Sequence, residues 1–164
     1  MKRFIAKNAA VFGDVTIGEK STIWFQAALR GDSNTIKIGK LTNIQDNTVV
    51  HVDHDAPTVI EDNVTIGHSC IIHGCTVKSG ALIGMGTIIL NHAEIGENSL
   101  IGAGSLVTEH TKIPPNMLAF GSPAKVIRPL TEKEIEKNRQ NAQHYFELGQ
   151  EYLAGKYPEY HDES

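Results

Sequence analysis

The chain has 164 residues and a formal net charge of -4 at pH 7. This length suits one domain with a hydrophobic core and is short for two. The negative net charge and the lack of a lysine or arginine run argue against nucleic acid or an anionic membrane as the main partner. No stretch is apolar enough for a signal peptide or a membrane span, so we expect a cytoplasmic protein that does not attach to membranes.

An aliphatic residue recurs at every sixth position through most of the chain and is often followed by glycine. A helix would space apolar residues by three and four, and a simple sheet would alternate them by two. A period of six with turn residues in every repeat is typical of an all-β solenoid, the parallel β-helix of hexapeptide repeats. Each hexapeptide forms one flat side, and three sides make a coil of about 18 residues. The aliphatic positions in phase are Val11, Ile17, Ile23, Leu29, Ile60, Ile66, Ile72, Val77, Ile83, Ile89, Ile95, Ile101, Val107 and Ile113.

Three interruptions break this period. The phase slips between Leu29 and Ile44, and the segment VDHDAP, residues 52–57, is predicted to form an external loop. One residue is also missing between Ile72 and Val77. Insertions in a solenoid fall at its corners and often gather on the functional face, which draws attention to this part of the chain.

The repeat ends after Ile113, and the sequence beyond it predicts one helix. Thr131 and Glu134 have the spacing of a capping box, and apolar residues at helical spacing follow them. We therefore expect a β-helix domain over residues 1–130 and a C-terminal helix over residues 131–153 that packs along the solenoid or against a neighbour. A flexible tail is expected over residues 154–164.

The candidate functional residues are histidines in the interrupted part of the repeat, His51, His68 and His73. Because the step from His51 to His68 is nearly as long as one coil, we expect these two on neighbouring coils of the same side. The shorter step to His73 should place that residue on the next side. That separation is too large for one chain to place all three around an ion at about 2.1 Å. The nearby Cys70 and Cys75 are expected to be buried thiols rather than ligands, as is usual in a reducing compartment.

A cyclic trimer would remove this difficulty, since imidazoles from two chains can converge at each interface. Three histidines with an open fourth position form the ligand set of a catalytic zinc that activates water. The alternative is that the three are unrelated surface or interface histidines, because no local two-histidine motif supports the site.

Several segments together resemble one family over nearly the whole repeat, from Val11 to Pro129. The chain is similar to the γ-class carbonic anhydrases and to the bacterial hexapeptide-repeat proteins often labelled transferases or ferripyochelin-binding-like proteins. The resemblance implies a left-handed β-helix that forms a homotrimer, with zinc bound between subunits. The matching segments are VTIGEKSTIWFQAALRGD, IGKLTNIQDNTVVHVD, VTIGHSCIIHGC, LIGMGTIILNHAEIG and LIGAGSLVTE.

The resemblance also implies the ligands of the metal and the residues around it. His51 and His73 match two ligands of one chain, and His68 matches the ligand that a neighbouring subunit contributes. Zinc is the expected metal, although imidazole ligands also accept Fe²⁺ or Co²⁺. Arg30 and Asp32, in LRGD, match a pair that orders the subunit interface near the metal.

Two further residues, Gln45 and Asp46 in NIQD, match those that hold the zinc-bound hydroxide and its surroundings. Gln45 would orient that hydroxide through a hydrogen bond, while carboxylates such as Asp46 would orient a ligand histidine or a nearby arginine. Asn43 is a weaker candidate beside them. The alternative for the charged residues of this set is a purely structural network of ion pairs at an interface.

The implied reaction is attack of zinc hydroxide on carbon dioxide to give bicarbonate, the chemistry of a metal-dependent lyase. The long acidic loops that carry a glutamate proton shuttle in the founding enzymes are missing here. His54 is the natural substitute as proton shuttle, or else an exposed loop histidine without a role. Asn138, Asn141 and Tyr145 are loose counterparts of an asparagine and a tyrosine near the family's C-terminal helix. These departures count against a fast rate.

Two other functional classes stay open. Hexapeptide-repeat acyltransferases or thioesterases act on acyl-CoA with one histidine as general base, and His92 or His54 would serve that role here. Three clustered histidines exceed what that chemistry needs. The third class is a metal-binding trimer without turnover.

Overall fold

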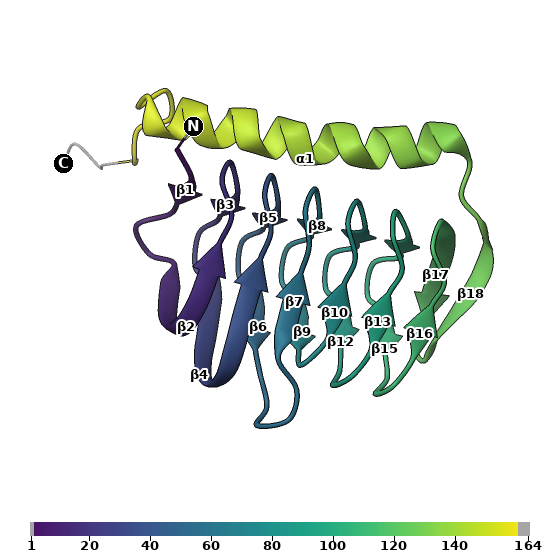
Figure 1. The fold of residues 1–164 in the computed structure, drawn as a ribbon. Coiled ribbons are helices and arrows are strands. Elements are labelled where there is room, and N and C mark those ends of the chain that lie inside the picture. The colour runs from purple at the N-terminus through teal and green to yellow at the C-terminus, as the bar shows by residue number, and fades with distance from the viewer. Residues whose placement is uncertain (1, 161–164) are drawn as a thin grey trace.

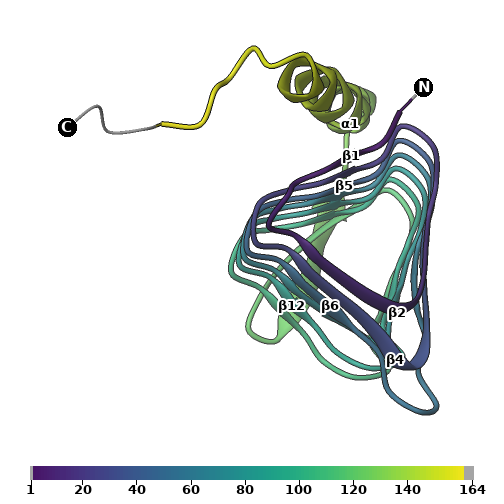
Figure 2. The same ribbon diagram turned by 90° about the vertical axis from the view of Figure 1, so that its left-hand side faces the viewer.

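Short strands stack in parallel into three flat faces, and these faces close into a left-handed β-helix with one helix along its side (Figure 1). The computed structural model describes residues 2–160. Seen along its axis, the β-helix is triangular, with the helix lying over one of the three sides (Figure 2). The fold class predicted from the six-residue period is confirmed.

The side that carries the helix is called the helix face here. Consecutive strands on it pair in parallel, with the one antiparallel pair at its end formed by the last two strands. Its strands are β1 (Phe4–Ile5), β3 (Thr22–Ile23), β5 (Asn43–Ile44), β8 (Thr65–Ile66), β11 (Leu82–Ile83), β14 (Leu100–Ile101), β17 (Met117–Gly121) and β18 (Ala124–Pro129).

The other two sides are the histidine face and the third face, and the long strands β2 (Ala10–Ile17) and β4 (Ala28–Ile38) bend around the corner between them. The first part of β4 pairs with β6 and its last part pairs with β7. Beyond β2 and β4, the histidine face consists of β6 (Val49–His51), β9 (Ile71–His73), β12 (Ile88–Ile89) and β15 (Leu106–Val107). The third face continues with β7 (Thr58–Ile60), β10 (Thr76–Val77), β13 (Glu94–Ile95) and β16 (Lys112–Ile113).

The core is a set of stacked aliphatic side chains inside the triangle. Ile23, Ile44, Ile66 and Ile83 lie directly above one another because their strands pair in register. Each of these four is fully buried, which is worth about 1.5–3 kcal/mol per side chain relative to exposure. The predicted six-residue phase therefore marks the residues that point inward.

The coils differ in length where the sequence interrupts the repeat. Val77 pairs in register with Ile95, one full turn of three hexapeptides later, as the regular repeat predicts. The coil that joins Ile60 to its partner Val77 is shorter by a single position. The coil that joins Val50 to its partner Ile72 is longer, because the loop at residues 52–57 lies between them. The irregular coils are thus the ones that carry the candidate histidines.

The C-terminal helix α1 (Glu132–Leu153) begins where the sequence predicts it. The Thr131 hydroxyl accepts a hydrogen bond from the Glu134 backbone N–H, and the Glu134 carboxylate accepts one from the Thr131 backbone N–H. Gly149 lets the helix approach the sheet closely, since a Cβ there would lie 2.8 Å from Thr22 Cγ2 and 2.9 Å from Phe4 Cβ. The helix packs along its own solenoid, one of the two placements predicted.

Aromatic side chains join α1 to the first coils. Trp24, which is almost fully buried, has ring-centroid distances of 4.8 Å to Phe4, 5.5 Å to Tyr145 and 5.4 Å to Tyr152. Such tilted and edge-to-face pairs stabilise by about 0.5–1.5 kcal/mol each beyond their burial. This cluster fixes the helix at the N-terminal end of the solenoid.

The domain boundaries predicted at residues 130 and 153 stay a prediction. The predicted flexible tail, residues 154–164, lies outside the described residues from 161 onward. Of its described part, Lys156 Nζ and Tyr157 Oη both donate hydrogen bonds to the Glu151 carboxylate. Among residues 2–160, no helix is long and apolar enough to cross a membrane.

Candidate metal centre

Two of the three predicted ligands meet on the histidine face. His51 ends β6 and His73 ends β9, and the two pair in register with each other and with Arg30 of β4. The residue before each of them points into the core, so alternation along the strand turns the imidazoles outward. Because stacked coils lie about 4.8 Å apart, side chains at the same register position must touch.

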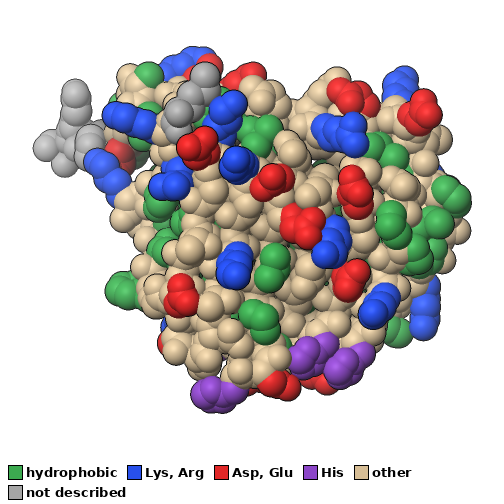
Figure 3. Space-filling model, in the orientation of Figure 1, with side chains coloured by type: hydrophobic (Ala, Val, Ile, Leu, Met, Phe, Trp, Pro, Cys, Tyr) green, Lys and Arg blue, Asp and Glu red, His purple; other side chains and the backbone are tan. Residues whose placement is uncertain are grey.

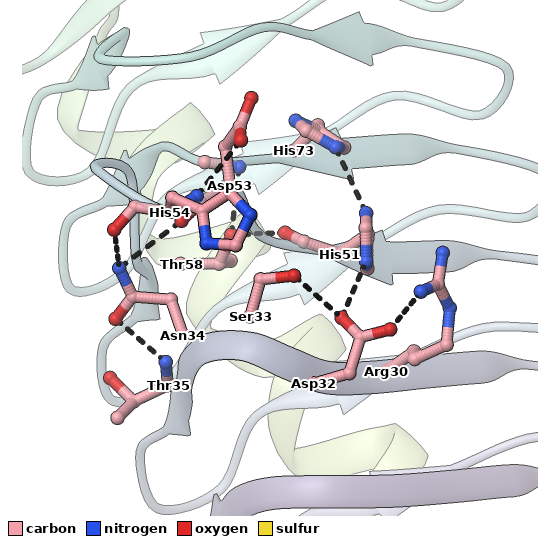
Figure 4. Close-up of polar contacts among 11 residues, drawn as sticks. Arg30, Asp32, Ser33, Asn34, Thr35, His51, Asp53, His54, Thr58 and His73 are labelled. Carbon is pink, nitrogen blue, oxygen red and sulfur yellow. Dashed lines mark hydrogen bonds and ion pairs between the residues drawn. The ribbon is translucent and has the colours of Figure 1, made fainter.

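The two imidazoles face each other through ring nitrogens (Figure 4). His51 Nδ1 lies 3.0 Å from His73 Nε2, and the ring centroids are 5.0 Å apart. Two nitrogens bound at about 2.1 Å to a tetrahedral zinc ion would lie about 3.4 Å apart. The pair therefore fits two ligands of one metal ion after an adjustment of a few tenths of an ångström.

Asp32 and Arg30 fix the orientation of His51. The Asp32 Oδ1 atom lies 3.0 Å from His51 Nε2, and the other carboxylate oxygen is paired with the Arg30 guanidinium. The hydrogen bond from His51, followed by the contact with Arg30, keeps the pKa of Asp32 well below its usual range. Asp32 is thus an ionised acceptor, so His51 Nε2 donates to it and His51 Nδ1 keeps its lone pair toward His73.

The third predicted ligand, His68, lies elsewhere on the chain. It occupies the turn before β9, at the corner between the helix face and the histidine face, and its Nδ1 atom lies 2.9 Å from Asp46 Oδ2. Asp46 has the equivalent place one coil earlier, since its carbonyl accepts the backbone N–H of Ser69. Both side chains are partly exposed.

The expectation that His51 and His68 share one side on neighbouring coils is wrong. The loop at residues 52–57 lengthens that coil, so the residue that aligns with His51 is His73. Within residues 2–160, no group of three or more His, Cys, Asp or Glu side chains is placed to hold one metal ion. One chain alone therefore brings two candidate nitrogen ligands, those of His51 and His73, together at this position.

Gln45 belongs to a buried amide network beneath α1. Its Nε2 atom donates to Asn43 Oδ1 at 3.0 Å, and Asn43 Nδ2 donates to Thr65 Oγ1 at 2.9 Å. Asn141 of α1 donates to the same hydroxyl at 3.2 Å. The structure thus joins Gln45, Asn43 and Asn141 through the Thr65 hydroxyl, and these hydrogen bonds do not involve the histidine pair.

The other helix candidates lie near this network. Tyr145 packs edge-on against Trp24 with ring centroids 5.5 Å apart, and burial, followed by the negative charge of Asp46, raises its pKa. Asn138 is buried, and its Nδ2 atom has no hydrogen-bond partner among the described residues.

His54 and His92 lie at the corner between the histidine face and the third face. His54 is anchored through its backbone, whose N–H donates to Asp53 Oδ1 at 2.8 Å (Figure 4). His92 stacks on His110 with ring centroids 4.9 Å apart, and its Nε2 atom lies 3.5 Å from Asp55 Oδ2. In Figure 3, the histidines visible from this side gather along the edge away from α1.

The two cysteines are unsuited to bind metal. Cys70 and Cys75 are buried and unpaired, and burial raises the pKa of their thiols to about 11 and about 12. They are therefore neutral thiols, as predicted, and not thiolate ligands.

A hollow of about 390 Å³ at Lys37, Glu61 and Asp62 lies on the third face, away from the histidine pair.

One residue that the sequence did not single out contacts the pair. Asn91, in the segment LNHAEIG, lies one coil beyond His73, and its Oδ1 atom is 2.6 Å from His73 Nδ1. The adjacent His92 drew attention in that segment because imidazoles are common catalytic groups. No pattern in the sequence distinguishes Asn91 from the other asparagines found at corners.

Known proteins resemble this chain along most of its length. A profile of the bacterial transferase hexapeptide family (six repeats) matches residues 74–109. A protein from Geobacillus kaustophilus named carbonic anhydrase is 56% identical over 151 residues, which cover 92% of this chain and 83% of that protein. Gamma carbonic anhydrase 2, mitochondrial, from Arabidopsis thaliana is 47% identical over 90% of this chain, which spans only 55% of the plant protein. The solved structure of a hexapeptide transferase family protein from Anaplasma phagocytophilum has a TM-score of 0.89 and 46% identity, covering 92% of this chain and 89% of that one.

Proposed function

Because the chain belongs to the γ-class carbonic anhydrase family of hexapeptide-repeat proteins, we propose that it is a metal-dependent lyase that interconverts carbon dioxide and bicarbonate. The observation that carries this proposal is the pair of imidazole nitrogens, His51 Nδ1 and His73 Nε2, that face each other 3.0 Å apart. Facing nitrogens of this kind suit a shared cation, since two lone pairs at that distance repel each other.

We propose that His68 of a neighbouring subunit completes the ligand set in a homotrimer. Two features support this assignment. His68 is partly exposed at a corner, where Asp46 fixes its ring, so its other nitrogen is free to point away from its own chain. The histidine face also exposes apolar side chains, Phe12, Val49 and Ile71, at 69%, 42% and 40% of their surface. An exposed apolar face suits a contact between subunits, and cyclic symmetry would repeat that contact three times.

Zinc is the proposed metal, with Fe²⁺ or Co²⁺ as substitutes that imidazole ligands also accept. When bound, such an ion acts as a Lewis acid and lowers the pKa of a coordinated water to about 7. The residues of the chain would position this chemistry. Asp32 and Arg30 hold His51 with Nδ1 free, and Asp46 holds His68 through Nδ1.

In the proposed reaction, the oxygen of the water would form a bond to the carbon of carbon dioxide while one carbon–oxygen π bond opens and leaves its electron pair on oxygen. One water O–H bond breaks and releases its proton, so the products are bicarbonate and a proton. Gln45 is proposed to orient the attacking oxygen, because it directly precedes Asp46, the residue that holds the proposed ligand His68. His54 is proposed to take the released proton and pass it to the buffer, since its loop directly follows His51.

Hydration measured by stopped flow, on a sample whose metal content and mass are also determined, tests the proposal. We expect a trimer with about one metal ion per chain and hydration that a chelator abolishes and zinc restores. A metal-loaded trimer without hydration would overturn the reaction and leave a metal-binding protein. A monomer without bound metal would overturn the site as well.

Acyl transfer is the second candidate, because a similar solved structure is titled as a member of the hexapeptide transferase family. His92 or His54 would then act as general base toward an acyl-CoA. Release of free CoA from acetyl-CoA, with and without amine acceptors, distinguishes the two activities. Turnover that persists after metal removal and is lost in a His92→Ala variant would favour the transferase.

We also propose that the protein works in the cytoplasm. Cys70 and Cys75 are both buried and unpaired, which suits a reducing compartment. Fractionation of the source cells would test this placement.

A further inference from the structure

Asn91 connects His73 to the external loop. Its side-chain Oδ1 lies 2.6 Å from His73 Nδ1, and its Nδ2 donates to Asp53 Oδ2 at 3.1 Å. The three residues come from β9, from the next corner of the solenoid and from the loop at residues 52–57. Asp53, Asn91 and His73 therefore form one chain of hydrogen bonds that ends at a candidate ligand.

The direction of this hydrogen-bond chain follows from Asp53. Asp53 Oδ1 accepts the His54 backbone N–H at 2.8 Å, and Asp53 Oδ2 accepts from Asn91 Nδ2 at 3.1 Å, so both carboxylate oxygens serve as acceptors. The Asn91 NH₂ group must then point to Asp53, and its carbonyl oxygen must point to His73. An amide oxygen accepts, so the His73 ring carries its proton on Nδ1 and leaves Nε2 as a bare lone pair.

The same nitrogen, His73 Nε2, is the one that faces His51 Nδ1 at 3.0 Å. Asp32 and Asn91 thus act on the two imidazoles in the same way. Each accepts the proton on the nitrogen that points away from the pair, and each leaves the inner nitrogen free.

Gly74 leaves the space that the Asn91 side chain occupies. Gly74 follows His73 with φ +57°, and a Cβ on it would lie 2.5 Å from Asn91 Oδ1 and 2.8 Å from the Ala56 Cβ. Any larger residue at this corner would displace the amide from His73. This coil is one residue shorter than a regular coil, and Gly74 has no side chain. Together these two features bring Asn91 close to His73.

Hydrogen bonds within the external loop and to Asn34 fix the position of Asp53. Asp53 and Ala56 exchange two backbone hydrogen bonds of 2.9 and 3.1 Å, and the Asn34 side chain donates to the carbonyls of Asp53 and His54 (Figure 4). These hydrogen bonds therefore hold the base of the protruding loop, where Asp53 lies, against the solenoid.

We propose that Asn91 is a positioning residue that fixes His73 with its proton on Nδ1, and that Asp53 sets the direction of the Asn91 amide. The inference rests on the proposed function, in which His73 Nε2 is a metal ligand. Its structural part, the position of the proton on His73, can be tested in the metal-free protein.

The test combines two readouts on Asn91→Ala and on a matched control. Asn98 lies over Gly80 as Asn91 lies over Gly74, since a Cβ on Gly80 would lie 2.4 Å from Asn98 Oδ1, but it is at a different corner. Ring ¹⁵N spectra of the metal-free protein at alkaline pH report which nitrogen of His73 is protonated, and competition with a chelator gives the zinc Kd. We expect Asn91→Ala to shift the His73 proton toward Nε2 and to raise the Kd about 10- to 100-fold. Asn98→Ala should change neither readout beyond about twofold.

A reciprocal exchange keeps the proposal testable if Asn91→Ala is poorly folded. Asp53→Asn alone removes the carboxylate that sets the amide, so His73 should again lose its single protonated form. Combined with Asn91→Asp, it places an acceptor beside His73 and a donor on the loop, so the Nδ1–H form and the zinc affinity should return.

The outcomes separate this inference from the proposed function. An unchanged His73 spectrum in Asn91→Ala, or no recovery in the exchanged variant, would overturn the positioning role even if the wild-type protein hydrates carbon dioxide. A shifted His73 spectrum in a protein that binds no zinc would support the structural part and overturn the proposed metal site.

Discussion

His51 Nδ1 lies 3.0 Å from His73 Nε2, although the two residues are far apart in the chain. They meet because β6 and β9 pair in register and both end in an outward-facing histidine. If a neighbouring subunit supplies His68, two variants that each lack a different ligand should together form complete metal sites in mixed trimers. We expect His68→Ala and His73→Ala proteins each to lose bound metal while remaining folded.

When these two variants are mixed under conditions in which subunits exchange, some interfaces combine an intact pair from one chain with an intact His68 from the other. Random assembly of equal amounts would give about one such interface in four. Metal content and hydration should recover to about a quarter of the wild-type level. No recovery, despite mixed trimers seen by native mass spectrometry, would place the complete site within one chain or remove His68 from it.

Asp32→Asn should weaken metal binding without unfolding the protein. The substitution keeps the shape of the side chain but removes the charge that fixes His51 with Nε2 protonated. Loss of a carboxylate partner of a ligand histidine typically raises the metal Kd about 10- to 100-fold, and chelator competition would measure it. Asp62→Asn is the matched control, because Asp62 accepts the Lys40 backbone N–H on a distant corner. Equal effects of the two substitutions would assign Asp32 a purely structural role.

Replacement of His54 should slow proton release while the metal stays bound. In His54→Ala, we expect hydration at low buffer concentration to fall by at least about tenfold and to recover when imidazole buffer is added. His110→Ala, farther along the same edge of the solenoid between β15 and β16, should leave the rate unchanged. A His54→Ala protein with wild-type rates at low buffer would show that the released proton leaves by another route.

Thr65→Val should destabilise the contact between α1 and the solenoid. The Thr65 hydroxyl is the shared acceptor for the amides of Asn43 and Asn141, and valine has nearly the same shape without an acceptor. Leaving buried amides without this partner costs about 1–3 kcal/mol in the free energy of unfolding. Urea unfolding at a fixed protein concentration measures the change. Thr87→Val, which removes a single hydroxyl donor to the Gly102 carbonyl, should cost about 1 kcal/mol or less, and a larger loss there would contradict the network's importance.

The start of α1 should be sensitive to acid. The Arg128 guanidinium, and then Thr131, lower the pKa of Glu134 from 4.5 to about 2. A carboxylate whose pKa is lowered in the folded state stabilises that state above its unfolded pKa and loses the effect as pH falls through the folded pKa. The contribution of Glu134 should thus be complete above about pH 5 and disappear toward about pH 2.

Side-chain NMR titration of Glu134 would check its midpoint directly. The difference in urea midpoint between the wild-type protein and Glu134→Gln should also shrink as the pH is lowered through this range. A Glu134 midpoint at the ordinary value for glutamate, or a difference that does not depend on pH, would contradict the ion pair with Arg128.

The sequence predicts the fold well because its signal is repeated along the chain. Every isoleucine at the repeated position, such as Ile66 and Ile83, points into the core. One irregular coil therefore does not hide the six-residue period. The capping box of Thr131 and Glu134 is equally local, and it places the start of α1 correctly.

The sequence predicts the arrangement of the site less well. The step from His51 to His68 resembles a coil in length, but the loop at residues 52–57 adds to the same coil and shifts the register to His73. Asn91 escapes prediction for a different reason. Its partners, Asp53 and His73, are distant in the sequence, and an asparagine at a solenoid corner has no feature that distinguishes a ligand-orienting amide from an ordinary turn residue.

The helix α1 runs along the helix face in the direction opposite to the stacking of the coils. Its length must therefore match the number of coils that it covers. Asn141 contacts Thr65 of β8, whereas Gly149 lies against Thr22 of β3, two rungs earlier. Eight helical residues rise about 12 Å, close to the roughly 10 Å of two coil spacings. A chain that gained a coil would therefore need about three more helical residues to keep its new rung covered. Changes in the number of coils and in the length of the C-terminal helix should occur together, even though the helix lies far along the chain from the coils that it covers.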